Sequence, residues 1–187
     1  MSRQVFTLAN QLTLLRLALI PFFVLALRGG QYGWALGLLL VAGVSDLLDG
    51  LLARWLKQRT SLGAYLDPIA DKLLFSTAFV VLAIKGEVPW ALSILVLGRD
   101  VLILAIALVI IIGAGFRPFA PSVYGKACTA TQAVTLFVVV VFALEPHPAL
   151  LTAKQALLWL TGALTVLSGM HYAYRTGTVL PEIPPKP

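Results

Sequence analysis

The chain has 187 residues, of which 59% are hydrophobic and 12% are charged, and its formal net charge is +6. These values exclude a water-soluble domain, because globular proteins carry about 25% charged residues and a core of this size could not bury so many aliphatic side chains. The excess of basic residues comes without any nucleic-acid-binding pattern, so we do not expect nucleic acid as a partner. Anionic lipid is the expected partner instead. The sequence therefore indicates an integral membrane protein.

Six apolar stretches follow one another along the chain, and each is long enough to cross a bilayer once. They cover roughly residues 10–27, 34–54, 63–84, 89–112, 123–144 and 150–173. Only helices satisfy their backbone within such segments, so we predict an all-α fold with six transmembrane helices. We expect a single transmembrane domain over residues 1–180, followed by a proline-rich tail at residues 181–187. Segments such as Arg28-Gly29-Gly30 and Lys85-Gly86-Glu87 predict tight turns between the helices.

Basic residues are distributed unevenly between the two sides that six crossings would create. Nine of the lysines and arginines outside the spans fall on the side of both termini, against three on the other side, Arg28, Lys85 and Lys154. Short cytoplasmic loops carry the excess of positive charge in membrane proteins. We therefore expect both termini to face the cytoplasm, with the protein in a bacterial inner membrane.

Acidic residues cluster where the second and third predicted helices face the cytoplasm. Four of the eight acidic residues of the chain lie there, Asp46, Asp49, Asp67 and Asp71. Helical spacing places the aspartates of each helix on one stripe with small residues, Gly50 and Ala53 on the second helix and Gly63 and Ala70 on the third. Each carboxylate costs at least about 2.5 kcal/mol near a bilayer, so a functional role is the default explanation.

Carboxylates without histidine or cysteine favour a hard cation such as Mg²⁺ or Mn²⁺, and four of them suffice for two ions. Arg54 follows the stripe of the second helix and could bind a phosphate through two hydrogen bonds, which suits metal-assisted phosphoryl-type transfer. One alternative is a structural ion-pair network with Arg54, Lys57 and Lys72. Another is a cation transporter, which would be expected to repeat the cluster in its second half; that half offers only Asp100, Glu145 and Glu182.

The pattern Asp46-x2-Asp49-Gly50-x2-Ala53-Arg54-x8-Gly63-x3-Asp67-x3-Asp71 resembles the signature of the CDP-alcohol phosphatidyltransferase family. The resemblance implies a six-helix membrane enzyme, commonly a homodimer, that uses an alcohol hydroxyl and two divalent cations to displace CMP from a CDP-linked lipid. By position, the four aspartates would hold the metals, with Asp67 and Asp71 catalytic and Asp71 the general base. The CDP group would be bound by Asp49, Gly50, Ala53, Arg54 and Gly63.

Two further segments resemble the glycerophospholipid branch of that family. Asn10, Thr13 and Arg16 match its Asn-x2-Thr-x2-Arg start, and Asn10 and Thr13 would also contact the CDP group. Lys126 lies in a Gly-Lys-x2-Thr segment that implies a phosphate contact. The alternatives are an interfacial polar cap for the first segment and an ordinary interfacial lysine for the second.

A basic acceptor site is predicted from Arg99, Arg117 and Lys126. Arg99 falls inside a predicted span, where it could not face lipid, and its alternative role is an ion pair with the acidic cluster. Three cations favour an alcohol that carries its own phosphate. We expect glycerol 3-phosphate as acceptor and phosphatidylglycerophosphate as product. The alternative is phosphatidylglycerol as acceptor, because Gly98-Arg99-Asp100 resembles the eukaryotic-type cardiolipin synthases, whereas phosphatidylglycerophosphate synthases usually have Arg-Glu there.

Overall fold

The computed structural model of the chain describes the backbone of residues 8–55, 61–114 and 123–179, and the side chains of residues 11, 14–45, 72–106 and 123–174. The described backbone forms six helices, α1 Leu8–Arg28, α2 Tyr32–Trp55, α3 Ser61–Ile84, α4 Trp90–Ala114, α5 Val123–Leu144 and α6 Pro148–Val179. This confirms the all-helical prediction. Each boundary lies within two residues of its predicted position, except that α6 continues six residues beyond the predicted span.

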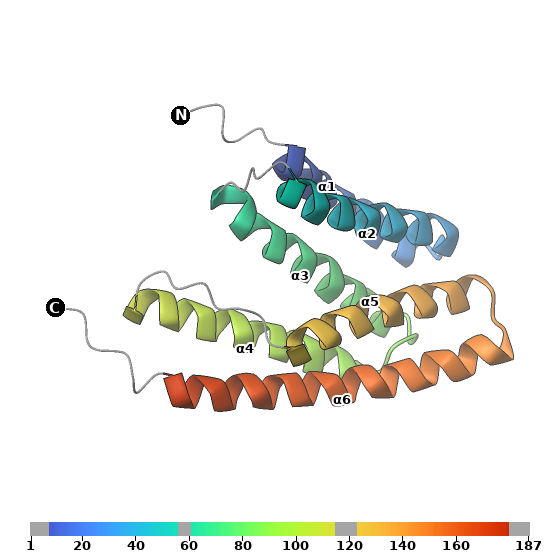
Figure 1. Cartoon of the computed structure of the whole chain (residues 1–187). Coiled ribbons are helices and arrows are strands. Elements are labelled where there is room, and N and C mark those ends of the chain that lie inside the picture. The colour runs from blue at the N-terminus through green and yellow to red at the C-terminus, as the bar shows by residue number, and fades with distance from the viewer. Residues whose placement is uncertain (1–7, 56–60, 115–122, 180–187) are drawn as a thin grey trace.

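The six helices alternate in direction along the bundle (Figure 1). The end of α2 and the start of α3, which carry the aspartate motif, lie at the left of Figure 1 together with the start of α1 and the end of α6. We call this the motif end. The short turns after α1, α3 and α5 lie at the opposite end. The alternation places both halves of the motif on one side of the molecule.

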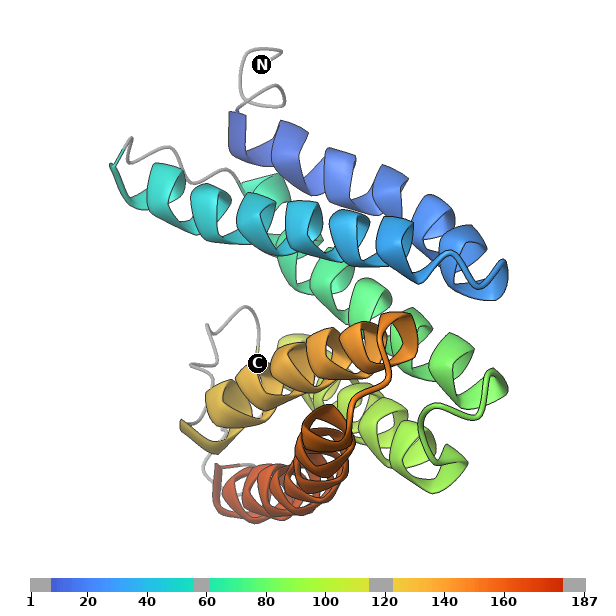
Figure 2. The ribbon, with the colours of Figure 1, turned by 90° about the vertical axis from the view of Figure 1, so that its right-hand side faces the viewer.

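The helices pack as two groups that α3 and α5 connect. In the first group α1 packs against α2 and α3, and in the second α6 packs against α4 and α5. Contacts of α3 with α4 and α5, and of α2 with α5, join the groups. Figure 2 shows α1 and α2 above the second group, with α3 descending between them. A side chain on α3 can therefore reach residues of either group.

The main hydrophobic core lies where α1, α2 and α3 meet α4 and α5. Large side chains such as Phe23, Phe79 and Leu136 are at most 1% exposed there. Each such side chain contributes about 1.5–3 kcal/mol on burial in water, and in a bilayer its close packing contributes instead through van der Waals contact. The outward faces are also apolar, with Trp34 and Trp159 73% and 83% exposed. Apolar exterior and apolar core together are typical of helices surrounded by lipid.

Two turns at the opposite end are built on glycines with positive φ, as their sequences predict. Gly30 has a φ of 71° and Gly86 a φ of 77°, a region that L-residues with a side chain rarely adopt. The residue after each glycine donates its backbone N–H to a carbonyl five residues earlier, Gln31 to Ala26 and Glu87 to Leu82, both at 2.9 Å. These hydrogen bonds are the helix-ending pattern that glycine permits.

Two stretches of the described residues are long and apolar enough to cross a membrane, Val123–Leu144 and Pro148–Tyr174. Shorter apolar stretches occur at Tyr32–Ser45 and Lys72–Ile84. Length and hydropathy therefore support two crossings directly, and crossing by the other four helices stays a prediction.

Candidate active site

The aspartate motif lies on two successive helices at one end of the bundle. Asp46 and Asp49 belong to α2, and Asp67 and Asp71 belong to α3. Their side chains lie outside the described residues, as do those of the other predicted motif and CDP-binding positions, Asn10, Thr13, Gly50, Ala53, Arg54 and Gly63, and the whole of the predicted acceptor residue Arg117. The described side chains include no group of three or more His, Cys, Asp or Glu residues able to hold a metal ion. The predicted metal ligands are thus placed by helix and by end of the bundle only.

Arg16 is a buried cation in the helix that packs against both motif helices. Its side chain lies on α1 and is 1% exposed, and α1 contacts α2 and α3. Burying a guanidinium is costly unless anionic or polar groups compensate it. This burial makes Arg16 part of the interior between α1 and the two helices that carry the motif.

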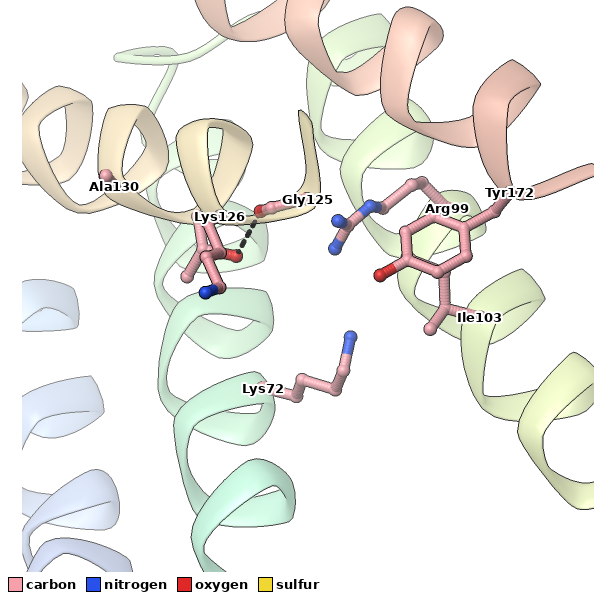
Figure 3. A pocket seen from close by; sticks show the side chains of 8 residues that line it. Lys72, Arg99, Ile103, Gly125, Lys126, Ala130 and Tyr172 are labelled. Atoms are coloured by element: carbon pink, nitrogen blue, oxygen red, sulfur yellow. Dashed lines mark hydrogen bonds between the residues drawn. The ribbon is translucent and has the colours of Figure 1, made fainter. Parts of the chain in front are cut away.

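A cavity of about 410 Å³ lies between α3, α4, α5 and α6. Figure 3 shows three cationic side chains around it, Lys72 from α3, Arg99 from α4 and Lys126 from α5. The remaining lining comes from Ile103, Gly125, Thr129, Ala130 and Tyr172. Four helices therefore contribute to one site whose lining is basic on several sides.

The cavity adjoins the aspartate motif through α3. Lys72 follows Asp71 directly in that helix. Neighbouring residues of a helix differ by about 1.5 Å in height along its axis, so the last motif position and the cavity lie at nearly the same level of the bundle. A ligand in the cavity would thus be close to the helix segment that carries the predicted general base.

One carboxylate joins two of the cavity's cations. Asp100 is 5% exposed, and its Oδ1 accepts hydrogen bonds from Lys72 Nζ and from Arg99 Nη1, each at 2.7 Å. A carboxylate between two cations compensates the burial of both and holds their side chains in fixed positions. The Lys72–Asp100 ion pair links α3 to α4 beside the cavity.

Ser168 and Tyr172 of α6 complete the surroundings of Arg99. Ser168 Oγ accepts hydrogen bonds from Arg99 Nη2 at 2.9 Å and from Arg99 Nε at 3.3 Å. The Tyr172 ring centroid lies 6.0 Å from the Arg99 guanidinium carbon, at the outer limit of a cation–π contact. Arg99 is 8% exposed, and its guanidinium is held by Asp100 of α4 and Ser168 of α6.

Lys126 differs from the other two cations because it is exposed and has no ion-pair partner among the described residues. The helix around it is ordinary, with Thr129 Oγ1 donating to the Gly125 carbonyl at 3.1 Å. Among the described side chains that line or contact the cavity, three cations face one carboxylate, which leaves a formal charge of +2. Such a site attracts an anion, and a dianion best.

The structure brings Arg99 and Lys126 to one cavity, as the sequence prediction of an acceptor site requires. Among the described residues, Arg99 and Lys72 both form an ion pair with Asp100. The side chains of the acidic cluster, the partner considered for both cations from the sequence, lie outside the described residues. The sequence did not predict Lys72 or Tyr172 as cavity residues, nor Ser168 as a partner of Arg99. A usable signal was the spacing of Ser168 and Tyr172, which at i and i+4 place two polar groups on one face of an apolar helix.

Known proteins resemble this chain over most of its length. A sequence model of the CDP-alcohol phosphatidyltransferase family matches residues 6–167. A Mycobacterium tuberculosis protein named "Probable phosphatidylglycerophosphate synthase" is 36% identical over 178 residues, covering 90% of this chain and 80% of the relative.

Two relatives carry the other name in this branch. A Mycobacterium bovis protein provisionally named as a cardiolipin synthase is 41% identical over 127 residues, covering 67% of this chain and 60% of the relative. The Homo sapiens protein named "Cardiolipin synthase (CMP-forming)" is 39% identical over 100 residues, covering 53% of this chain and 33% of the relative. With the aspartate motif on α2 and α3, a helical membrane fold and a family match over most of its residues, the chain belongs to the CDP-alcohol phosphatidyltransferase family.

Proposed function

We propose that this enzyme transfers the phosphatidyl group of CDP-diacylglycerol to glycerol 3-phosphate, releasing CMP and forming phosphatidylglycerophosphate. The observation that carries the proposal is the cavity lined by Lys72, Arg99 and Lys126 beside the motif segment of α3. An acceptor whose phosphate occupies this cavity would have its hydroxyl directed toward the motif. The described side chains of the cavity have a formal charge of +2, which suits a phosphate monoester, because a monoester carries close to two negative charges at neutral pH.

The transfer needs one bond formed and one broken at phosphorus. The acceptor hydroxyl oxygen attacks the phosphorus attached to diacylglycerol, and the bond from that phosphorus to the bridging oxygen of CMP breaks. Asp71 takes the proton of the hydroxyl, and CMP leaves with the bonding electron pair as a phosphate oxyanion. In this reaction Arg54 would bind the diphosphate of CDP-diacylglycerol.

The family is generally dependent on divalent cations. Four carboxylates without nearby histidine or cysteine in the motif are a donor set for hard cations, so Asp46, Asp49, Asp67 and Asp71 would hold two ions of Mg²⁺ or Mn²⁺. When bound, such ions neutralise the diphosphate and make its phosphorus more electrophilic. The contribution of the protein is then to position the acceptor and to accept its proton.

Sequence similarity supports glycerol 3-phosphate as the acceptor. A relative that is 36% identical and is aligned over 90% of this chain and 80% of its own length carries the name of a phosphatidylglycerophosphate synthase. The Gly125-Lys126-x2-Thr129 segment, which phosphatidylglycerophosphate synthases share, contributes Gly125, Lys126 and Thr129 to the cavity lining. The same residues that resemble the branch therefore lie where an acceptor phosphate would bind.

A second acceptor is phosphatidylglycerol, which would make the enzyme a cardiolipin synthase. Asp100, where phosphatidylglycerophosphate synthases usually have Glu, is the residue that ties Lys72 to Arg99. The human relative also bears the cardiolipin synthase name. A phosphodiester carries a single negative charge, however, so it compensates the +2 cavity less completely than a monoester does.

We infer a homodimer in a bacterial inner membrane, with the motif end and both termini on the cytoplasmic side. The excess of basic loop residues on that side supports the orientation. Water-soluble glycerol 3-phosphate would then reach the cavity from the cytoplasm, while CDP-diacylglycerol arrives from the surrounding lipid.

The acceptor is tested by incubating detergent-purified protein with CDP-diacylglycerol and Mg²⁺, with glycerol 3-phosphate and phosphatidylglycerol in separate reactions. We expect CMP and phosphatidylglycerophosphate with glycerol 3-phosphate. CMP and cardiolipin with phosphatidylglycerol alone would overturn the proposed acceptor while keeping the reaction class. No CMP with either acceptor would reject both.

The base is tested by Asp71→Asn, which preserves shape and removes the proton-accepting charge. General-base catalysis contributes about 10²- to 10⁴-fold, so CMP release should fall at least about a hundredfold. Turnover within a few-fold of the parent protein would reject Asp71 as the base. Chelation of divalent cations should abolish CMP release in the parent, and readdition of Mg²⁺ or Mn²⁺ should restore it.

A further inference from the structure

The hydrogen bonds of Arg99 divide its donors into two sets. A guanidinium carries five N–H groups, one on Nε and two on each terminal nitrogen. Asp100 accepts from Nη1, and Ser168 accepts from both Nε and Nη2. No other acceptor from the described residues contacts the group. One N–H on Nη1 and one on Nη2 therefore remain.

The terminal nitrogens that carry these two donors face the cavity. Figure 3 shows the terminal nitrogens of Arg99 directed into the space between Lys126, Tyr172 and Lys72. Two parallel N–H groups of a guanidinium match two oxygens of a phosphate. The orientation that leaves these donors available depends on acceptors from two different helices, α4 and α6.

Ser168 differs from other buried hydroxyls of the bundle. Ser45, Thr135 and Thr165 each donate to the backbone carbonyl four residues earlier, at 2.6–2.7 Å, as hydroxyls in helices commonly do. The Ser168 hydroxyl, which is 0% exposed, instead accepts two hydrogen bonds from the one cation that α4 directs toward the cavity. The hydrogen bonds that the Ser168 hydroxyl accepts therefore come from Arg99 of another helix.

We propose that Ser168 is a positioning residue for acceptor specificity: together with Asp100 it fixes the Arg99 guanidinium so that its two remaining N–H groups receive the acceptor phosphate. The inference rests on the proposed function, because it assigns a role within the same acceptor site. Ser168 itself touches neither the acceptor nor the reacting atoms. Its contribution is to hold Arg99 in the orientation that binding requires, which lowers the entropy lost when the phosphate binds.

The first test compares Ser168→Ala with a matched control, Ser93→Ala. Ser93 is also a buried serine, 1% exposed, but its Oγ donates to the Phe79 carbonyl at 3.0 Å, about two turns of α4 away from Asp100 and outside this network. Loss of a hydrogen bond to a charged group corresponds to about a tenfold change. Ser168→Ala should therefore raise the KM for glycerol 3-phosphate about tenfold and leave kcat and the KM for CDP-diacylglycerol within about twofold, and Ser93→Ala should change none of the three.

An equal rise in both KM values, or an unchanged KM for glycerol 3-phosphate, would overturn the proposal. Ser168→Thr, which retains the hydroxyl, should recover at least part of the parent KM if its thermal midpoint shows that the added methyl is accommodated. If Ser168→Ala yields no folded protein, Ser168→Cys, which is close in size to serine and a much weaker hydrogen-bond acceptor, replaces it in both tests with the same expected results.

The second test is a double-mutant cycle with Arg99→Ala. If Ser168 acts through Arg99, adding Ser168→Ala to Arg99→Ala should change kcat/KM for glycerol 3-phosphate by less than about twofold. Multiplied effects of the two substitutions would mean that Ser168 acts independently of Arg99, and would overturn the positioning role.

Failure of the inference can be separated from failure of the proposed function. If the parent protein uses phosphatidylglycerol instead of glycerol 3-phosphate, the same variants are measured with phosphatidylglycerol, whose phosphodiester still offers two non-bridging oxygens to the two N–H groups. If the parent releases no CMP with either acceptor, inorganic phosphate serves as the probe. It should raise the thermal midpoint of the parent and of Ser93→Ala but not of Ser168→Ala, and an equal rise in all three would overturn the inference.

Discussion

Toward the motif end, Lys72 and Arg99 both pair with the carboxylate of Asp100. At the opposite end, Lys154 is the one cation among the described residues that pairs with Glu87. Lys154 Nζ lies 2.5 Å from Glu87 Oε2. Its ammonium also lies 4.6 Å from the centroid of the Phe142 ring, within cation–π distance. Lys154 and Arg99 are equally buried, at 8% exposed each.

The two groups differ in charge balance and in open volume. The Lys154–Glu87 pair is neutral and is not part of the cavity lining, and it joins α6 to the turn after α3. The Arg99 group has a cationic excess and borders about 410 Å³ of space. Burial of a paired cation therefore does not by itself identify a binding site. Excess positive charge next to open volume identifies a binding site, because only there can an external anion enter and balance the charge.

The largest expected effect is on the acceptor site. Arg99→Ala removes two donors to the acceptor phosphate, each a charge-assisted hydrogen bond, so kcat/KM for glycerol 3-phosphate should fall about a hundredfold. Arg28→Ala, which removes an exposed arginine at the opposite end, is the control and should have no such effect. Steady-state CMP release checks this. A fall of similar size in Arg28→Ala would mean that the assay reports overall charge rather than the site.

Lys154→Met should have the converse effect, on stability and not on catalysis. It leaves Glu87 without its cation, and because that carboxylate is 24% exposed we expect about 2 kcal/mol, less than the 3–5 kcal/mol typical of a fully buried pair. The thermal midpoint in detergent should drop by about 5 °C while the KM for the acceptor stays unchanged. Lys85→Met, at an exposed lysine of the same end, should change neither. A raised acceptor KM in Lys154→Met would break the distinction between the two groups.

Lys126→Ala should have a smaller effect than Arg99→Ala, because Lys126 is exposed and screened by solvent. The KM for glycerol 3-phosphate should rise about fivefold or less, and the difference from the parent should shrink as salt is added. KM values at low and high ionic strength test this. An effect that salt does not change would show that Lys126 makes a desolvated contact with the acceptor instead.

The smallest expected effect concerns Tyr32, beside the neutral pair. Burial raises the pKa of the Tyr32 phenol, and the negative charge of Glu87 raises it further. A raised pKa in the folded state stabilises the protein below the ordinary pKa of tyrosine, about 10, and this contribution is lost as the pH rises through the folded value. The thermal midpoint of the parent relative to Tyr32→Phe should therefore decrease between about pH 9.5 and about pH 11. A constant difference over that interval would contradict the assigned surroundings.

Much of the fold could be predicted because its causes are local in sequence. Stretches of about twenty apolar residues predict helices, and Gly30 and Gly86 predict turns, since only the nearby chain decides whether a positive φ is tolerated. The end of α6 was predicted six residues too early, because the polar residues after Ala173 end the apolar stretch but do not end the helix. Hydropathy marks the limit of a membrane core, whereas the helix continues as long as its backbone hydrogen bonds do.

The candidate site also has one part that the sequence predicts and one part that it does not. The aspartate motif is recognisable because its residues lie within two neighbouring helices at fixed spacing, and its metal-binding and catalytic roles stay predictions. The cavity is built from contacts between distant positions: Lys72 and Asp100 are 28 residues apart, and Arg99 and Ser168 are 69 residues apart. No local pattern specifies which serine of α6 will meet an arginine of α4.

The helical class, the turns, the aspartate motif and the presence of cations that cannot face lipid all follow from the amino-acid sequence alone. Hydrophobicity, backbone geometry and charge cost act on each segment separately, so each of these features can be derived from the segment that carries it. Helix packing, in contrast, brings Lys72, Arg99 and Lys126 around one cavity, lets Asp100 link two of these cations, and places Ser168 of α6 against Arg99 of α4. Such partners are fixed by how helices pack, since a buried charge is compensated by whichever polar group the packing brings within hydrogen-bond distance.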